Sequence, residues 1–187
     1  MSETNMNHER ENEALSTRLL KNRTVLLFGK LDEKKASAVV SAMLYLEGLD
    51  PEASITLYIN TEGGAETDIL AIYDVMRHLR CPVETVCVGK AHGLSALILG
   101  GGTKGCRKAY ANSEVMLSQV QRDRTFGQAS DIELETEHLL KVKERINQLL
   151  AAICQKGTEE IKNDLERKHW LFAEEAKSYG LIDEVIE

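Results

Sequence analysis

Short aliphatic runs alternate along the chain with longer stretches in which apolar residues recur at helical spacing. The runs at residues 24–28, 55–59 and 83–88 are aliphatic on both faces and have the length of buried strands. The stretches at 33–46 and 69–79 place apolar residues three or four positions apart, which predicts amphipathic helices. This alternation predicts an α/β fold with parallel strands, right-handed crossovers and helices covering the sheet.

Three further short elements and one long helix follow from the same pattern. Residues 13–20 predict a helix, and residues 106–110 and 115–117 predict short strands. Residues 128–155 contain neither Gly nor Pro, and they carry an apolar stripe from Ile132 to Ile153 between Glu and Lys residues. Such a helix is longer than an α/β layer needs. It either protrudes and packs against another subunit or lies as an ordinary amphipathic helix on its own sheet, and periodicity favours neither.

The N-terminal segment differs in character from the rest of the chain. Residues 1–14 are polar and mixed in charge, so we expect a flexible segment there and one domain over residues 15–187. The segment lacks the apolar core of a signal peptide, and the longest apolar stretch, residues 94–99, is too short to cross a bilayer. These patterns predict a protein without membrane segments, in the cytoplasm or the interior of an organelle.

Charge and cysteine usage narrow the function classes. The net charge of −7 disfavours nucleic acid and anionic membranes as general partners. The four cysteines, Cys81, Cys87, Cys106 and Cys154, show no metal-binding spacing, so we interpret them as small buried hydrophobic residues in a reducing compartment. We expect neither a metal nor a cofactor.

The most informative segment is residues 89–96, with the sequence GKAHGLSA. It follows the strand at 83–88 and precedes an apolar helix that we expect to begin at residue 93. The free N–H groups and the positive dipole end of a helix N-terminus favour an alkoxide, thiolate or oxyanion, so such turns often carry a nucleophile. Here the turn residue is Gly93, which has no side chain.

Several segments together resemble the ClpP family, the proteolytic subunits of Clp proteases. They are residues 17–23 (TRLLKNR), 57–65 (LYINTEGGA), 71–74 (AIYD), 127–133 (GQASDIE) and 173–185 (AEEAKSYGLIDEV). The resemblance covers residues 17–187 in family order. It implies the ClpP/crotonase fold of stacked ββα units with a protruding handle helix, the handle region covering about residues 119–156. It also implies heptameric rings that pair into a barrel.

The resemblance also implies a Ser-His-Asp triad, in which a hydroxyl attacks the peptide carbonyl, an imidazole takes its proton and a carboxylate orients the imidazole. The family's serine falls on Gly93, its histidine on Ser118 and its aspartate on Lys168. None of the three side chains can perform the role of the residue that it replaces. By the same carry-over, the backbone N–H groups of Gly64 and Leu94 would form the oxyanion hole.

Two other residue pairs are candidates for a relocated catalytic site. Ser95 with His92 lacks a third residue to orient the base, and Ser95 should point toward the packed side of its helix. Ser118 with Lys168 occupies two triad positions that should be neighbours, but its nucleophile would lie away from the oxyanion donors. We therefore expect a serine beside a solvated lysine rather than a catalytic pair.

The remaining family positions concern assembly. Gln128 and Arg167 match residues that meet across the ring–ring interface, whereas Arg122 and Arg124 stand in a strip that is rich in glycine in the family. Tyr58 matches an aromatic residue of the docking pocket for the Clp ATPase, but His78 stands where an aromatic residue is usual. The resemblance thus implies a homo- or hetero-oligomer, a heptameric ring or double ring with ClpP-type subunits, with docking of an ATPase less certain.

Three functions follow, in decreasing order of support. The first is a catalytically inactive ClpP-like subunit with a structural or regulatory role in ring assembly, similar to the ClpR-type subunits. The second is an active serine-type endopeptidase with a rearranged site. The third is a crotonase-like acyl-CoA enzyme, since that fold uses paired backbone N–H groups to hold an enolate oxygen; the short chain and the lack of a CoA-binding signature disfavour it.

Overall fold

A computed structural model describes residues 15–120 and 128–187 of the chain. Five parallel strands form the main path of the sheet, in the order β1-β2-β3-β4-β7. They are β1 (Thr24–Phe28), β2 (Ile55–Thr61), β3 (Val83–His92), β4 (Arg107–Tyr110) and β7 (Glu184–Ile186). Each parallel pairing needs a crossover, and the helices between the first strands supply it. The predicted parallel α/β arrangement is confirmed.

Strand β3 joins two parts of the sheet. Its residues Thr85 to Cys87 pair with β4, whereas Lys90 to His92 pair with β5 (Glu114–Leu117). Between the two stretches lies Gly89 at φ +87°, and the pairing with β2 shifts register in the same region. Strand β6 (His169–Phe172) then adds to β5 in antiparallel orientation. The second part of the sheet therefore grows from the carboxyl end of β3.

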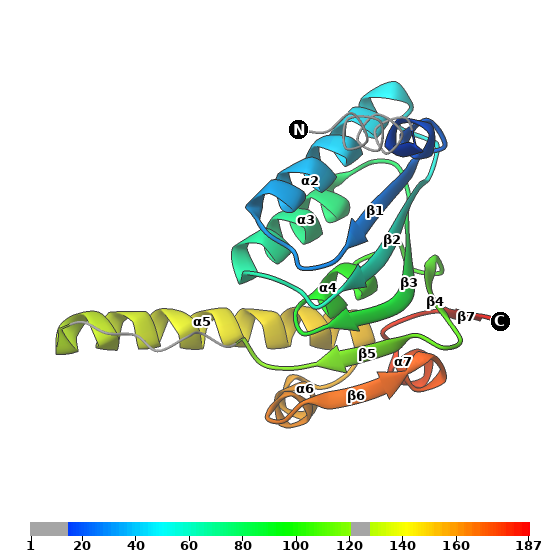
Figure 1. Cartoon of the computed structure of the whole chain (residues 1–187). Coiled ribbons are helices and arrows are strands. Elements are labelled where there is room, and N and C mark those ends of the chain that lie inside the picture. Colours follow the sequence, from blue (N-terminus) through cyan, green and yellow to red (C-terminus); the bar gives the residue numbers. More distant parts are fainter. Residues whose placement is uncertain (1–14, 121–127) are drawn as a thin grey trace, which may run out of the picture.

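Two helices, α2 (Glu33–Leu49) and α3 (Glu66–His78), pack side by side on one face of the first strands (Figure 1). Asp32 caps α2 by accepting a hydrogen bond from the Lys35 N–H. The buried side of this layer holds Met43 and Leu46 of α2, and Ile69 and Ile72 of α3. Burial of these aliphatic side chains fixes the layer onto the sheet.

The face of the first strands opposite α2 and α3 is partly open in the described part of the chain. Leu26 and Phe28 of β1 are more than 40% exposed there, whereas helices cover the other face, as predicted. The face is partly polar: Lys108 of β4 pairs with Glu84 at 2.8 Å and with Glu184 at 3.3 Å, and the Thr56 hydroxyl donates to Glu84. A continuous aliphatic run did not distinguish a strand buried on both faces from one with a partly solvated face.

The long helix is α5 (Ala129–Cys154), and it projects away from the rest of the molecule (Figure 1). Residues 130–138 are exposed, whereas Ile146, Leu150, Ala151 and Cys154 near its end are buried. Of the two alternatives left open by periodicity, the structure shows the protruding one. Exposed Leu134 and Leu140 are apolar residues on its free part.

Short helices lie around the buried end of α5. They are α4 (Ser95–Gly100), which precedes α5 in the chain, and α6 (Thr158–Leu165) and α7 (Ala173–Tyr179), which follow it. Residues 15–21 form a further helix at the other end. The whole arrangement agrees with the fold that the resemblance implies, a mixed α/β structure with a protruding handle helix. The predicted flexible segment, residues 1–14, and residues 121–127 of the predicted handle region lie outside the described residues. Within residues 15–120 and 128–187, no helix has both the length and the apolar character that a membrane crossing requires.

Candidate functional site

The turn that carries Gly93 lies at the carboxyl end of β3. The strand runs to His92, so it is longer than predicted, and α4 begins only at Ser95. Gly93 adopts φ +61°, and its N–H donates to the Met116 carbonyl of β5 at 2.7 Å. The left-handed backbone at this position explains why glycine is tolerated well there. Ser95 is fully buried, and its hydroxyl donates to the His92 carbonyl at 2.7 Å.

A second glycine turn lies against this one. Gly63 adopts φ +90°, and a β-carbon placed on it would lie 3.0 Å from the His92 carbonyl oxygen. A β-carbon on Gly64 would collide with the backbone of Leu31, whose N–H donates to the Gly63 carbonyl. Close backbone approach therefore requires glycine at both positions, whatever chemistry the site performs.

The two turns and the end of β5 enclose a cavity of about 220 Å³, here named the Gly93 pocket. It is lined by residues 62–66, by Gly93 and Leu94, and by residues 118–120. A β-carbon built on Gly93 would lie 3.6 Å from the Ser118 hydroxyl oxygen. The structure thus brings together two of the three positions at which the family's triad is expected.

Lys168 lies at the beginning of β6, where its side chain is exposed. The antiparallel register pairs Leu117 with His169 as its last step. Continued by one residue, the same register sets Lys168 across from Ser118. The third expected position therefore lies at the edge of the same site, at the open end of the β5–β6 ladder.

The chemistry available in the Gly93 pocket is limited. Gly93 offers no nucleophile. None of the described residues that line the pocket beside Ser118 is a histidine. The N–H groups of Gly64 and Leu94, the expected oxyanion donors, make no hydrogen bond to other described residues. The pocket can therefore accept an electron-rich oxygen. Its described lining includes the Ser118 hydroxyl and the carboxylates of Glu62 and Glu66, but no histidine, cysteine or lysine side chain.

Cysteine offers no substitute nucleophile. Burial raises the pKa of Cys87 to about 12, and it raises the pKa of Cys154 to the same value. Both thiols remain protonated at neutral pH, and a protonated thiol is a poor nucleophile. Neither residue lines the Gly93 pocket. Residues 15–120 and 128–187 also contain no group of three or more side chains placed to hold a metal ion.

Two charged contacts border the pocket that sequence reasoning missed. The Lys90 ammonium donates to the Glu62 carboxylate at 2.6 Å, and this hydrogen bond lowers the pKa of Glu62. His92 Nε2 lies 3.0 Å from a Glu114 carboxylate oxygen, and its ring meets the Trp170 ring edge-on at 5.0 Å between centroids. The only sequence signal for these contacts is the register, because His92, Met116 and Trp170 lie opposite one another on β3, β5 and β6.

The positions expected to serve assembly are distributed over the surface. Gln128 is exposed immediately before α5, and Arg167 is exposed immediately before Lys168. Tyr58 is half-buried on β2, on the face that also carries Glu84 and Lys108. His78 is exposed at the end of α3. Arg122 and Arg124 lie outside the described residues.

A comparison with known protein families completes the picture. The family model for Clp protease matches residues 7–187, which is nearly the whole chain. The match includes both glycine turns, the strand after Gly93 that carries Ser118, the long helix α5 and the C-terminal elements. This chain therefore belongs to the Clp protease family.

Proposed function

We propose that this chain is a catalytically inactive Clp protease subunit whose role is to build or regulate a proteolytic ring. The proposal is supported by the residues at the three positions expected for the triad: Gly93 and Ser118 line one pocket, and the continued β5–β6 register sets exposed Lys168 across from Ser118. A base-activated nucleophile requires a hydroxyl or thiol, a base within hydrogen-bonding distance and a group that orients the base. Of the described side chains that line the Gly93 pocket, only Ser118 carries a hydroxyl, and none is a histidine or a thiol.

Preservation of the rest of the site supports an assembly role. The two glycine turns keep their close backbone contacts, and the fold around them has a tightly buried core. The free part of α5 presents apolar Leu134 and Leu140 to solvent, where an isolated protein gains nothing from them. These residues and the exposed Gln128 and Arg167 suit a contact with other Clp subunits.

The proposal also concerns the binding of a Clp ATPase to the face of the sheet that carries Tyr58. Tyr58 of β2 would contact a Clp ATPase. The neighbouring strands carry a charged ladder, in which Lys108 pairs with both Glu84 and Glu184. In addition, His78 stands in place of an aromatic residue. A charged ladder disfavours insertion of an apolar segment because its ion pairs would have to lose water. We therefore propose that the ATPase binds this subunit weakly and engages its neighbours in a mixed ring.

Native mass spectrometry tests the assembly role. The protein is measured alone and after mixing with catalytically active Clp subunits from the same cell. We expect a seven- or fourteen-subunit mass, in which the two chains occur together after mixing. The matched variant Leu134→Glu should weaken assembly, whereas Glu133→Gln, at an exposed neighbour on the same helix, should not. A protein that stays monomeric alone and in the mixture contradicts the proposal.

A further inference from the structure

His92 occupies an unusual position for a titratable side chain. It is the last residue of β3, directly before Gly93, and only 11% of its side chain is exposed. Its Nε2 atom is inaccessible to solvent and makes no hydrogen bond of good geometry to any described residue, although Glu114 is within ion-pair distance. A buried ring nitrogen in this state is a group whose interactions change markedly when it gains a proton.

We propose that His92, Glu114 and Trp170, here named the His92 cluster, form a protonation-sensitive joint between β3, β5 and β6. The three side chains come from three adjacent strands and face the same side of the sheet. With a neutral imidazole, the joint consists of an apolar edge-to-face contact with Trp170 and a single polar contact with Glu114. With an imidazolium, the same geometry provides an ion pair with Glu114 and a cation next to the indole ring.

The charged groups around His92 on other elements act in the same direction. Glu114 approaches from β5, and Glu62 approaches from the loop after β2, where the charge of His92 contributes to lowering the Glu62 pKa. Lys90, two residues earlier on β3, is already paired with Glu62. Met116 of β5 and Ser95 of α4 also neighbour His92, and neither carries a charge. An imidazolium at this position therefore meets two carboxylates and one lysine that is already neutralised.

The consequence reaches the Gly93 pocket through the backbone. The His92 carbonyl accepts the Ser95 hydroxyl, and the neighbouring Gly93 N–H donates to Met116. Strand β6, which Trp170 ties to the joint, begins next to Lys168 and Arg167. Protonation of His92 thus tightens the attachment of β6 to the strands that border the pocket. This joint does not depend on whether the subunit is inactive or assembles into a ring.

Trp170 is the sole tryptophan of the chain, so its fluorescence reports on the joint directly. Emission is recorded from about pH 5 to 8, the range in which histidine changes charge. For the full chain we expect one sigmoidal transition with quenching on the acid side. The transition should be absent in His92→Gln. In Glu114→Gln the quenching should be smaller, because the imidazolium loses its carboxylate partner.

The matched control is His169→Gln, because His169 is adjacent to Trp170 in sequence but contacts Tyr179 instead. It should keep the transition. A transition that persists in His92→Gln, or that disappears only in His169→Gln, overturns the proposal. If His92→Gln does not fold, the imidazole proton resonances of the unmodified protein replace it. A His92 resonance that titrates together with the fluorescence supports the joint, and one that does not move over this range overturns it.

Discussion

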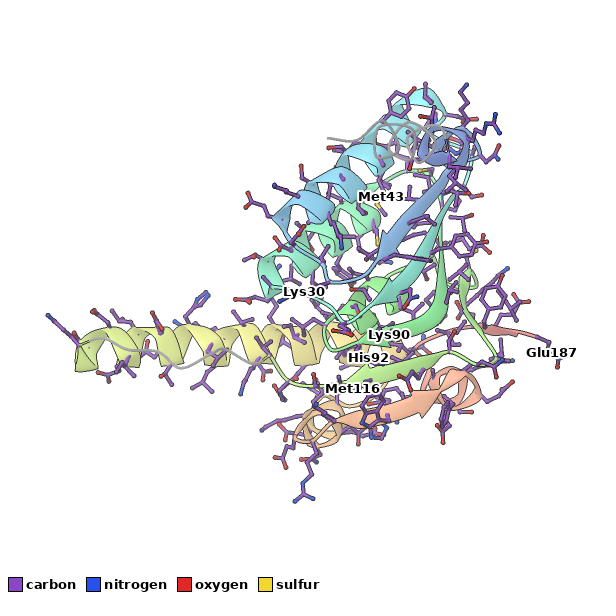
Figure 2. All side chains as sticks on the ribbon, in the orientation of Figure 1. Lys30, Met43, Lys90, His92, Met116 and Glu187 are labelled. Atoms are coloured by element: carbon purple, nitrogen blue, oxygen red, sulfur yellow. The ribbon has the colours of Figure 1, made fainter. Side chains whose placement is uncertain are left out.

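A β-carbon built on Gly93 would lie 3.6 Å from the Ser118 hydroxyl oxygen, and the β5–β6 register, continued by one residue, sets Lys168 across from Ser118. Three positions that are distant in sequence are therefore neighbours in the fold. The loss of a single catalytic residue could be compensated by a neighbour. If these are the triad positions, as we propose, nucleophile, base and orienting group are all replaced, and only the backbone donors are left. Figure 2 shows the neighbouring His92, Lys90 and Met116 at the junction of the two parts of the sheet.

Rebuilding the triad should restore chemistry if the three positions meet as proposed. The variant Gly93→Ser/Ser118→His/Lys168→Asp should hydrolyse a fluorogenic peptide about 10²-fold faster than Gly93→Ala/Ser118→His/Lys168→Asp, because general-base activation of a hydroxyl typically contributes 10²–10⁴-fold. The alanine control shares the backbone strain at φ +61° but lacks a nucleophile. Equal rates for the two folded variants would show that the three positions do not form a triad geometry.

Gly180 is required both by its backbone and by its surroundings. It ends α7 at φ +90°, and a β-carbon on it would lie 2.7 Å from the Cys154 carbonyl oxygen. Gly180→Ala should lower the free energy of unfolding by about 3 kcal/mol, the sum of left-handed strain and a backbone clash. Gly105 has φ +89° but open space around it, so Gly105→Ala should cost only about 1–2 kcal/mol. Urea denaturation of both variants checks the difference, and equal losses would contradict it.

The Arg107–Asp183 pair connects β4 to the C-terminal segment. The Nε and Nη2 groups of Arg107 donate to the two carboxylate oxygens of Asp183, at 2.8 and 2.6 Å, and Asp183 also accepts the backbone N–H groups of Gly105 and Arg107. The Arg107 hydrogen bonds hold the pKa of Asp183 below its usual value. A lowered folded-state pKa contributes stability above the unfolded-state value near 4, and this stability is lost as the pH falls through the folded-state pKa.

Asp183→Asn should therefore lower the free energy of unfolding at pH 7 by about 3 kcal/mol, because it leaves the buried Arg107 without its charge partner. The difference from the unmodified protein should shrink toward pH 3. Glu184→Gln, at an exposed ion pair with Lys108, is the control and should cost less than about 1 kcal/mol. Thermal unfolding at pH 7, 5 and 3 measures all three proteins. A loss that is independent of pH would show that Asp183 acts through shape alone.

Arg23 closes the carboxyl end of α2. Its guanidinium donates to the carbonyls of Leu46, Asp50, Ala53 and Ser54, and its backbone adopts φ +55°. Arg23→Ala should lower the free energy of unfolding by about 2 kcal/mol, since charged hydrogen bonds to helix-end carbonyls are lost. Lys21→Ala, an exposed cation nearby, should change it by less than about 0.5 kcal/mol. Denaturant titration separates the two, and a similar effect of both would indicate a general charge effect.

The aliphatic runs predicted β1 and β2 well, because strand length and apolar content suffice when neighbours along the chain pair in parallel. The end of β3 was placed at residue 88, whereas the strand continues to His92 through Gly89, whose left-handed backbone lets the chain change partner from β4 to β5. Glycine alone does not distinguish a strand that ends from one that changes partner. Helix α2 continues to Leu49 and α3 begins at Glu66, because apolar spacing marks the buried side of a helix rather than its ends.

The sequence likewise indicated only part of the candidate site. The positions of Gly93, Ser118 and Lys168 came from resemblance, and their proximity in the fold came from the register of β5 with its neighbours. The His92–Glu114 and Lys90–Glu62 contacts join residues from different strands, so no local pattern could reveal them. The short elements α6, β6, α7 and β7 carry too few residues for periodicity to show.

Reaction of the purified protein with a serine-directed phosphonate, combined with a fluorogenic peptide assay, tests the central claim most directly. The account predicts no hydrolysis above buffer and no adduct on any serine by mass spectrometry, because Ser95 is fully buried and no histidine lines the pocket beside Ser118. Hydrolysis that disappears in Ser118→Ala or Ser95→Ala, together with an adduct on that serine, would contradict it and establish a relocated active site.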